Sequence, residues 1–173
     1  MVLKINKFKN LLIFKLNKRG INVMFWFIHA LLGGAIGIYF NSVTLILLVA
    51  FISHFFLDML PHWGIGFDIE HFKDFYEAKI TKKVFFFGLF DALITIFLVS
   101  MFYQETHSKL FIIGAFASLL PDMFSLGYFT RIRNKKNYKR YIKFHSRIQK
   151  DADFMFGMFT QIIIFLVLLY LLI

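Results

Sequence analysis

The sequence predicts an all-α membrane protein that crosses the bilayer about five times and forms a single domain over residues 1–173. Of its residues, 59% are hydrophobic and 20% are aromatic, whereas a soluble domain averages about 45–50% apolar residues. Apolar stretches of nearly bilayer-spanning length recur along the chain. Because the chain has no cysteine, disulfide frameworks, thiolate metal sites and cysteine nucleophiles are excluded.

The predicted elements follow one another along the chain, with long connections at residues 61–83 and 130–153. Residues 1–23 form a basic segment whose mixture of apolar and cationic residues is typical of a helix lying on an anionic leaflet. A basic flank that only orients the first span would give the same pattern. A bilayer core needs about 20 helical residues. The stretches that approach this length are residues 24–40, 42–60, 84–103, 110–129 and 154–173.

The basic residues alternate with the predicted crossings. Six Lys and Arg precede the first span, four lie in residues 61–83 and nine lie in residues 130–153, whereas the other two connections hold only Lys109. Cytoplasmic loops carry the excess of Lys and Arg in membrane proteins. We therefore expect a multi-pass inner-membrane protein with a cytoplasmic N-terminus and an external C-terminus. The basic loops on the cytoplasmic side then account for the net charge of +10, and no nucleic-acid partner is expected.

Five ionisable residues fall within the predicted spans, where an unpartnered charge is costly. His54 and Asp58 are four residues apart, so a helix places both on one face. Each residue alone fits a helix-packing hydrogen bond, but five at the cytoplasmic end of four spans favour a site for a divalent metal, most suitably zinc or manganese. The predicted ligands are His29, His54, Asp58, Asp91 and Asp122.

Small residues accompany the first of these ligands. Gly33 and Gly37 follow His29 at four-residue intervals, and Gly114 and Ser118 have a similar spacing in the fourth span. Such stripes allow membrane helices to approach closely. We expect close packing around the site.

Two further histidines flank the predicted spans. His62 follows Pro61, which should end or kink the second helix, and His145 lies in the basic segment before the last span. Both are candidates for acid–base catalysis, and His145 is equally a candidate for a further metal ligand. Arginines of the same basic segment are expected to attract an anionic headgroup, although a solvated amphipathic helix explains the segment equally well. These arginines are Arg131, Arg133, Arg140 and Arg147.

Four segments carry a family resemblance. HALLGGAIG, SHFFLDMLPHW, GAFASLLPD and FHSRIQ occur in this order between residues 24 and 150. Together they resemble the YdjM-like family of bacterial inner-membrane, metal-dependent hydrolases. The resemblance implies a small helical membrane fold with His and Asp ligands near the cytoplasmic face. It matches His29, the Pro121–Asp122 pair and His145 to the family's first-span His, Pro-Asp element and later His.

The expected function is metal-dependent hydrolysis of a phosphoester or ester in an amphiphilic, lipid-like substrate reached from the cytoplasmic leaflet. Membrane lipids are the expected partners, and a homodimer is compatible with the small size of the bundle. The sequence contains no HExxH, GxSxG or P-loop motif. Zincin-type proteases, serine hydrolases and nucleotide-driven transporters are therefore not expected. Two alternatives stay open: a cation transporter or relay built from the same His and Asp, and a non-catalytic scaffold that binds lipid or a partner.

Overall fold

The computed structural model describes residues 24–64, 82–129 and 135–173. The predicted basic segment 1–23 and two of the predicted headgroup ligands, Arg131 and Arg133, lie outside this part of the chain. The prediction of an all-helical protein is confirmed for the described residues. Their elements are α2 (Trp26–Tyr39), α3 (Val43–Asp58), α4 (Lys82–Thr106), α5 (Lys109–Ser125), the 3-10 helix η1 (Leu126–Phe129), α6 (Lys136–Ile148) and α7 (Phe154–Leu172).

The helices at the five predicted spans differ in length. In the described part of the chain, only α4 with 25 residues and α7 with 19 are long and apolar enough to cross a membrane, instead of about five helices. α2 has 14 residues, α3 has 16 and α5 has 17. The difference has local causes. α3 ends at Asp58, just before Leu60, whose helical geometry Pro61 disfavours, and α2 begins only at Trp26 and ends at Tyr39, before the polar pair Asn41–Ser42.

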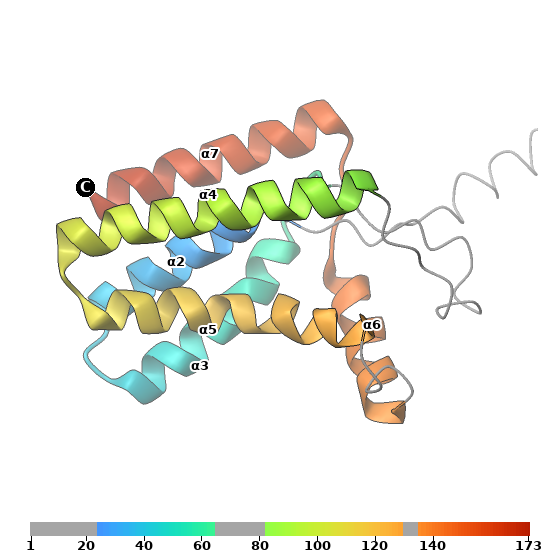
Figure 1. The fold of residues 1–173 in the computed structure, drawn as a ribbon, viewed down its shortest axis with the longest axis horizontal. Coiled ribbons are helices and arrows are strands. Elements are labelled where there is room, and N and C mark those ends of the chain that lie inside the picture. Colours follow the sequence, from blue (N-terminus) through green and yellow to red (C-terminus); the bar gives the residue numbers. More distant parts are fainter. Residues whose placement is uncertain (1–23, 65–81, 130–134) are drawn as a thin grey trace, which may run out of the picture.

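α2 forms the centre of the bundle and contacts α3, α4, α5 and α7. Figure 1 shows α4 and α7 on one side of α2, with α3 and α5 on the other. The core is apolar along most of this length, as expected where side chains from several helices interdigitate. Its buried residues are Met24, Ile28, Leu31, Ala35, Leu57, Phe102, Phe111, Leu168 and Leu172.

The predicted stripe of small residues lies at the contact between α2 and α5. A methyl group built on Gly33 would overlap the carbonyl of Gly114 and the hydroxyl of Ser118, and one built on Gly37 would overlap the backbone of α5. The Ser118 hydroxyl also donates a hydrogen bond to the carbonyl oxygen of His29 at 2.6 Å. The two backbones can approach this closely because glycine has no side chain.

α6 lies across one end of the bundle (Figure 1). The Tyr138 hydroxyl donates to the carbonyl oxygen of Ser125 at 2.8 Å, and the Tyr141 hydroxyl donates to that of Pro121 at 2.6 Å. Ser125 is the last residue of α5, where a helix leaves carbonyl oxygens without N–H partners of its own, and Pro121 lies one turn earlier. The two tyrosines therefore dock α6 against the C-terminal end of α5.

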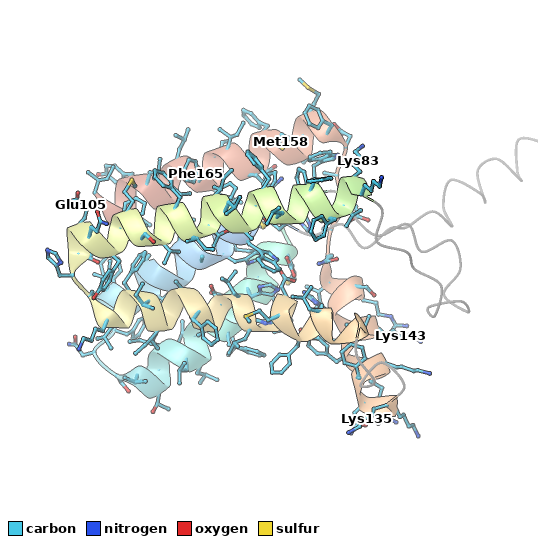
Figure 2. The ribbon with its side chains drawn as sticks, viewed as in Figure 1. Lys83, Glu105, Lys135, Lys143, Met158 and Phe165 are labelled. Atoms are coloured by element: carbon cyan, nitrogen blue, oxygen red, sulfur yellow. The ribbon has the colours of Figure 1, made fainter. Side chains whose placement is uncertain are left out.

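The two ends of the bundle differ in charge. Figure 2 shows Lys83, Lys135 and Lys143 at one end and Glu105 at the other. The C-terminus lies at the end that carries Glu105, opposite α6 (Figure 1). Basic residues from different connections therefore share one end of the molecule.

The outer faces of α4 and α7 are apolar and uncovered. In the most apolar 18-residue stretch of each helix, 11% of the stretch in α4 and 17% of that in α7 is buried inside the protein. A core helix of a soluble protein would be mostly buried. Phe86 and Phe97 on α4 are 64% and 66% exposed. An apolar surface of this extent needs a covering, and a bilayer provides one.

Candidate metal centre

A buried cluster of His and Asp side chains lies at the end of the bundle where α6 crosses it. His29 comes from α2, His54 and Asp58 from α3, Asp122 from α5 and His145 from α6, and each of these residues is at most 4% exposed. Two overlapping groups, His29–His54–Asp122 and His54–Asp58–His145, each place their donor atoms within 4.8 Å of one another. The structure thus brings together four of the predicted ligands and adds His145.

Three of the donor atoms form a compact triangle. The Nε2 atoms of His54 and His145 are 3.1 Å apart, and they lie 3.2 Å and 2.9 Å from Oδ2 of Asp58. With zinc–nitrogen bonds of about 2.0–2.1 Å, neighbouring ligand atoms are about 3.3 Å apart in a tetrahedral site and about 2.9 Å apart in an octahedral one. The triangle therefore has the dimensions of three ligands around a single ion.

The other two residues flank this triangle. Nε2 of His29 lies 3.4 Å from Oδ1 of Asp58, and Oδ1 of Asp122 lies 3.6 Å and 3.7 Å from Nε2 of His54 and His145. Among the described residues, His29 Nε2 and Asp122 Oδ2 have no hydrogen-bond partner although both are buried. Buried polar atoms are nearly always satisfied. A cation between them would satisfy both.

The charges in the cluster also favour a cation. Asp58 and Asp122 lie in the last turns of α3 and α5, where the helix dipole adds partial negative charge. The ion-pair partners of both carboxylates are histidine side chains. Two carboxylates buried at two helix C-termini are costly unless a positive charge compensates them, and a divalent ion has the required charge.

His145 is oriented by its second ring nitrogen. Its Nδ1 lies 3.1 Å from the Ser125 hydroxyl, which donates to the carbonyl oxygen of Pro121 at 3.2 Å. Because the carbonyl can only accept, Nδ1–H donates to the hydroxyl oxygen and Nε2 keeps its lone pair for a ligand. Burial by itself lowers the pKa of His145, but the hydrogen bond to Asp58 and the charge of Asp122 raise it above its usual value.

Asp91, another predicted ligand, lies outside both ligand groups. Its Oδ2 accepts a hydrogen bond from the backbone N–H of Trp26 at 2.9 Å, and Oε1 of Gln161 accepts one from that of Phe25 at 3.3 Å. The start of α2 has no capping side chain of its own, so residues of α4 and α7 satisfy its free N–H groups. Asp91 therefore holds the helix that carries His29.

His62, a predicted catalytic residue, is buried beside the cluster-bearing end of α3. Its Nδ1 lies 2.9 Å from the carbonyl oxygen of Leu60, so Nδ1 carries a proton, and in the neutral imidazole Nε2 is the acceptor. Nε2 is buried and has no hydrogen-bond partner among the described residues. Its main chain pairs with Lys150 and Ala152 in the connection between α6 and α7.

Sequence reasoning missed two residues that support the cluster. Ser125 orients His145, and Gln161 helps to hold the start of α2. Gln161 could have been found as a polar residue within the last apolar stretch, whereas the role of Ser125 depends on the docking of α6.

Of the predicted headgroup ligands within the described residues, Arg140 and Arg147 are exposed on α6.

The donor set determines which chemistry the cluster can perform. Imidazole nitrogens and carboxylate oxygens without a thiolate suit borderline or hard divalent ions such as zinc and manganese.

Comparisons with family models, curated proteins and solved structures find no match to this chain. Its function is therefore inferred from the residues and their geometry.

Proposed function

We propose that the protein is a membrane-bound, metal-dependent hydrolase that cleaves a phosphoester or ester bond in an amphiphilic substrate. This is the activity that the YdjM-like resemblance implies. The observation that carries the proposal is the convergence of imidazole and carboxylate donors from four helices at one buried end of the bundle. A divalent ion held there would supply Lewis-acid polarisation of a phosphoryl or carbonyl oxygen and would lower the pKa of water.

The proposed setting is the inner membrane, with five helices crossing it. The exposed apolar faces of α4 and α7 support this placement. The short α2 is enclosed by neighbouring helices, so its length need not match the hydrocarbon thickness. The separation of Lys83, Lys135 and Lys143 from Glu105 (Figure 2) supports a cytoplasmic N-terminus and an external C-terminus.

The cluster residues have distinct proposed roles. His54, His145 and Asp58 form the closest triangle and hold the ion, which we propose to be zinc or manganese. His29 and Asp122 complete the ligand set from the two sides. This assignment makes His145 a ligand rather than a proton carrier.

His62 is the proposed proton carrier. Its Nε2 is an acceptor without a partner in the described part of the chain, so it can receive a proton from water or from a substrate group. The bond from Nδ1 to the Leu60 carbonyl fixes the tautomer. In the neutral imidazole, Nε2 is therefore the nitrogen that faces no competing donor among the described residues and can accept the proton.

Elemental analysis of the detergent-purified protein tests the metal centre. We expect stoichiometric divalent metal in the wild type and its loss in His54→Ala and Asp58→Ala, with membrane insertion retained. The matched control is His107→Asn in the connection between α4 and α5, since asparagine tolerates the positive φ of 49° at this position. Metal that survives both cluster substitutions would overturn the proposal.

Hydrolysis can be tested separately with a fluorogenic short-chain phospholipid as the probe. His62→Gln should keep its metal and lose most of the turnover, because only the proton carrier is removed. His107→Asn should keep both. A His62→Gln protein with wild-type turnover would remove His62 from the reaction.

The burial of the cluster also favours a second function. All five residues are at most 4% exposed, which suits a structural ion in a scaffold that binds lipid or a partner protein. A metal-loaded wild type without metal-dependent hydrolysis of ester or phosphoester probes would favour the scaffold over the hydrolase. Metal-dependent turnover would exclude a purely structural ion.

A further inference from the structure

The outer face of α6 carries a stripe of cations. Lys136, Arg140, Lys143 and Arg147 are spaced by four, three and four residues, so they lie along one side of the helix. All four are exposed, and Phe144 beside them is 53% exposed. Residues 135–150 contain no Asp or Glu. The stripe is therefore a surface of one sign with an aromatic side chain at its edge.

The opposite face of the same helix reaches the cluster. Tyr138, Tyr141 and His145 lie at i, i+3 and i+7, and each forms a hydrogen bond with Pro121 or Ser125 at the C-terminal end of α5. Nε2 of His145 also lies 2.9 Å from Oδ2 of Asp58. A single helix thus joins the cationic stripe to one member of the cluster.

His145 differs from the other cluster residues in how it is held. His29, His54, Asp58 and Asp122 belong to the apolar bundle helices, whereas α6 crosses the end of that bundle (Figure 1). Its position depends mainly on polar contacts to α5 and on aromatic packing between α3 and the two residues Phe144 and His145. A ligand that holds the outer face of α6 in place would therefore also hold His145, because both lie on the same helix.

We propose that the cationic stripe of α6 binds anionic phospholipid headgroups of the surrounding leaflet, and that this contact keeps His145 in the cluster. The second part rests on the proposed metal centre. Charge complementarity identifies the lipid, since clustered Lys and Arg beside a membrane-embedded bundle bind anionic headgroups. Exposed Phe144 supports the same partner, because aromatic side chains favour the membrane interface.

A label at position 137 tests the lipid contact without any metal. The chain has no cysteine and Asn137 is exposed on α6, so Asn137→Cys gives a single site for a fluorophore in the full-length protein. In nanodiscs with brominated acyl chains, quenching should be several-fold stronger when phosphatidylglycerol is mixed into phosphatidylcholine. A variant with Lys136, Arg140, Lys143 and Arg147 all changed to Gln should lose this difference.

The matched control removes cations at the same end of the bundle but from another helix. Lys82→Gln/Lys83→Gln changes two exposed residues of α4 and should keep the lipid-dependent quenching. If the fourfold variant fails to fold, Arg140→Gln/Lys143→Gln and a salt titration of the wild type replace it. Both should reduce the difference, because salt screens exposed charges.

Metal affinity in the same nanodiscs tests the coupling. An anionic membrane concentrates divalent ions at its surface, so the comparison is between variants rather than between lipids alone. Phosphatidylglycerol should tighten zinc binding by about tenfold more in the wild type and in Lys82→Gln/Lys83→Gln than in the fourfold variant. Equal tightening in all three proteins would overturn the coupling.

The outcomes separate this inference from the proposed function. Lipid-independent quenching at position 137 would overturn the lipid contact even if metal is bound. A protein without metal in any nanodisc would overturn the metal centre and the coupling, while the quenching still decides the lipid contact. Binding of an RNA homopolymer that displaces the label from anionic lipid would also contradict the proposed partner.

Discussion

α2 and α4 are both apolar helices, yet their surroundings in the bundle are opposite. Gly33 on α2 lies against the backbone of α5, whereas Phe86 and Phe97 on α4 are more than half exposed. His29 on α2 belongs to the buried cluster. On α4, the buried Asp91 lies on the side that faces α2. Hydropathy alone does not separate the two helices, but the positions of their small and polar residues do.

The difference indicates how the bundle is stabilised. Lipid chains are as apolar as leucine, so burying apolar area in a membrane supplies little driving force between helices. Close backbone packing and hydrogen bonds must then hold α2 in place. Ser118, Asp91 and Gln161 supply such bonds from three different helices.

The largest expected effect comes from filling the closest contact of α2. Gly33→Leu would force its side chain into the carbonyl of Gly114, and we expect loss of the folded bundle. Gly88→Leu on α4 is the matched control, because a methyl group built there meets nothing within 4 Å. Size-exclusion chromatography and thermal unfolding in detergent measure both. A Gly33→Leu protein as stable as Gly88→Leu would contradict the close packing of α2 against α5.

A pair of phenylalanines gives the next largest effect. Phe111 is 0% exposed and Phe97 is 66% exposed. Phe111→Ala should lower the free energy of unfolding by about 3 kcal/mol because it opens a cavity. Phe97→Ala should change it by less than about 0.5 kcal/mol, since lipid can fill the space. Equal losses in reversible unfolding would show that the outer face of α4 is packed against protein.

The polar part of the interior can be probed at Ser125. Ser125→Ala removes the acceptor that orients His145, and substitutions of such supporting residues lower metal affinity by about 10–100-fold. Ser125→Thr retains the hydroxyl and should bind metal nearly as tightly as the wild type. Chelator competition measures both variants. If threonine binds as weakly as alanine, the hydroxyl does not orient His145.

The smallest expected effect is a pH dependence of metal binding. The hydrogen bond to Asp58 raises the pKa of His145, and a ligand nitrogen must lose its proton before it binds an ion. Affinity should therefore rise with pH, by up to about tenfold per unit, until the pH exceeds that pKa. Isothermal titration in several buffers measures the released protons. An affinity that falls as the pH rises would contradict His145 as a ligand.

The sequence predicts the fold class and part of the cluster for identifiable reasons. The four-residue spacing of His54 and Asp58 requires a shared helix face, and the alternation of cations along the chain places the polar ends of four helices together. The structure brings His54 and Asp58 together with His29 and Asp122, whereas Asp91 of α4 lies outside both ligand groups. The first predicted span is already short, but the end of α3 at Asp58 escaped prediction because apolar residues, Met59 and Leu60, continue past it.

The roles of Asp91 and His145 depended on tertiary contacts. Asp91 satisfies the start of α2, and sequence spacing cannot show which helix end lies beside a buried carboxylate. One signal was available, since Phe25 cannot cap a helix and the free N–H groups needed an acceptor. His145 joins the cluster because α6 docks through Tyr138 and Tyr141, and nothing in the basic segment indicates that docking.

X-ray absorption spectroscopy of the zinc-loaded, detergent-purified protein tests the central claim most directly. We expect a first shell of nitrogen and oxygen at about 2.0–2.1 Å, with outer-shell scattering from at least two imidazole rings that weakens in His54→Ala. A shell of oxygen alone, or imidazole scattering unchanged in that variant, would contradict a metal centre built from His54, His145 and Asp58.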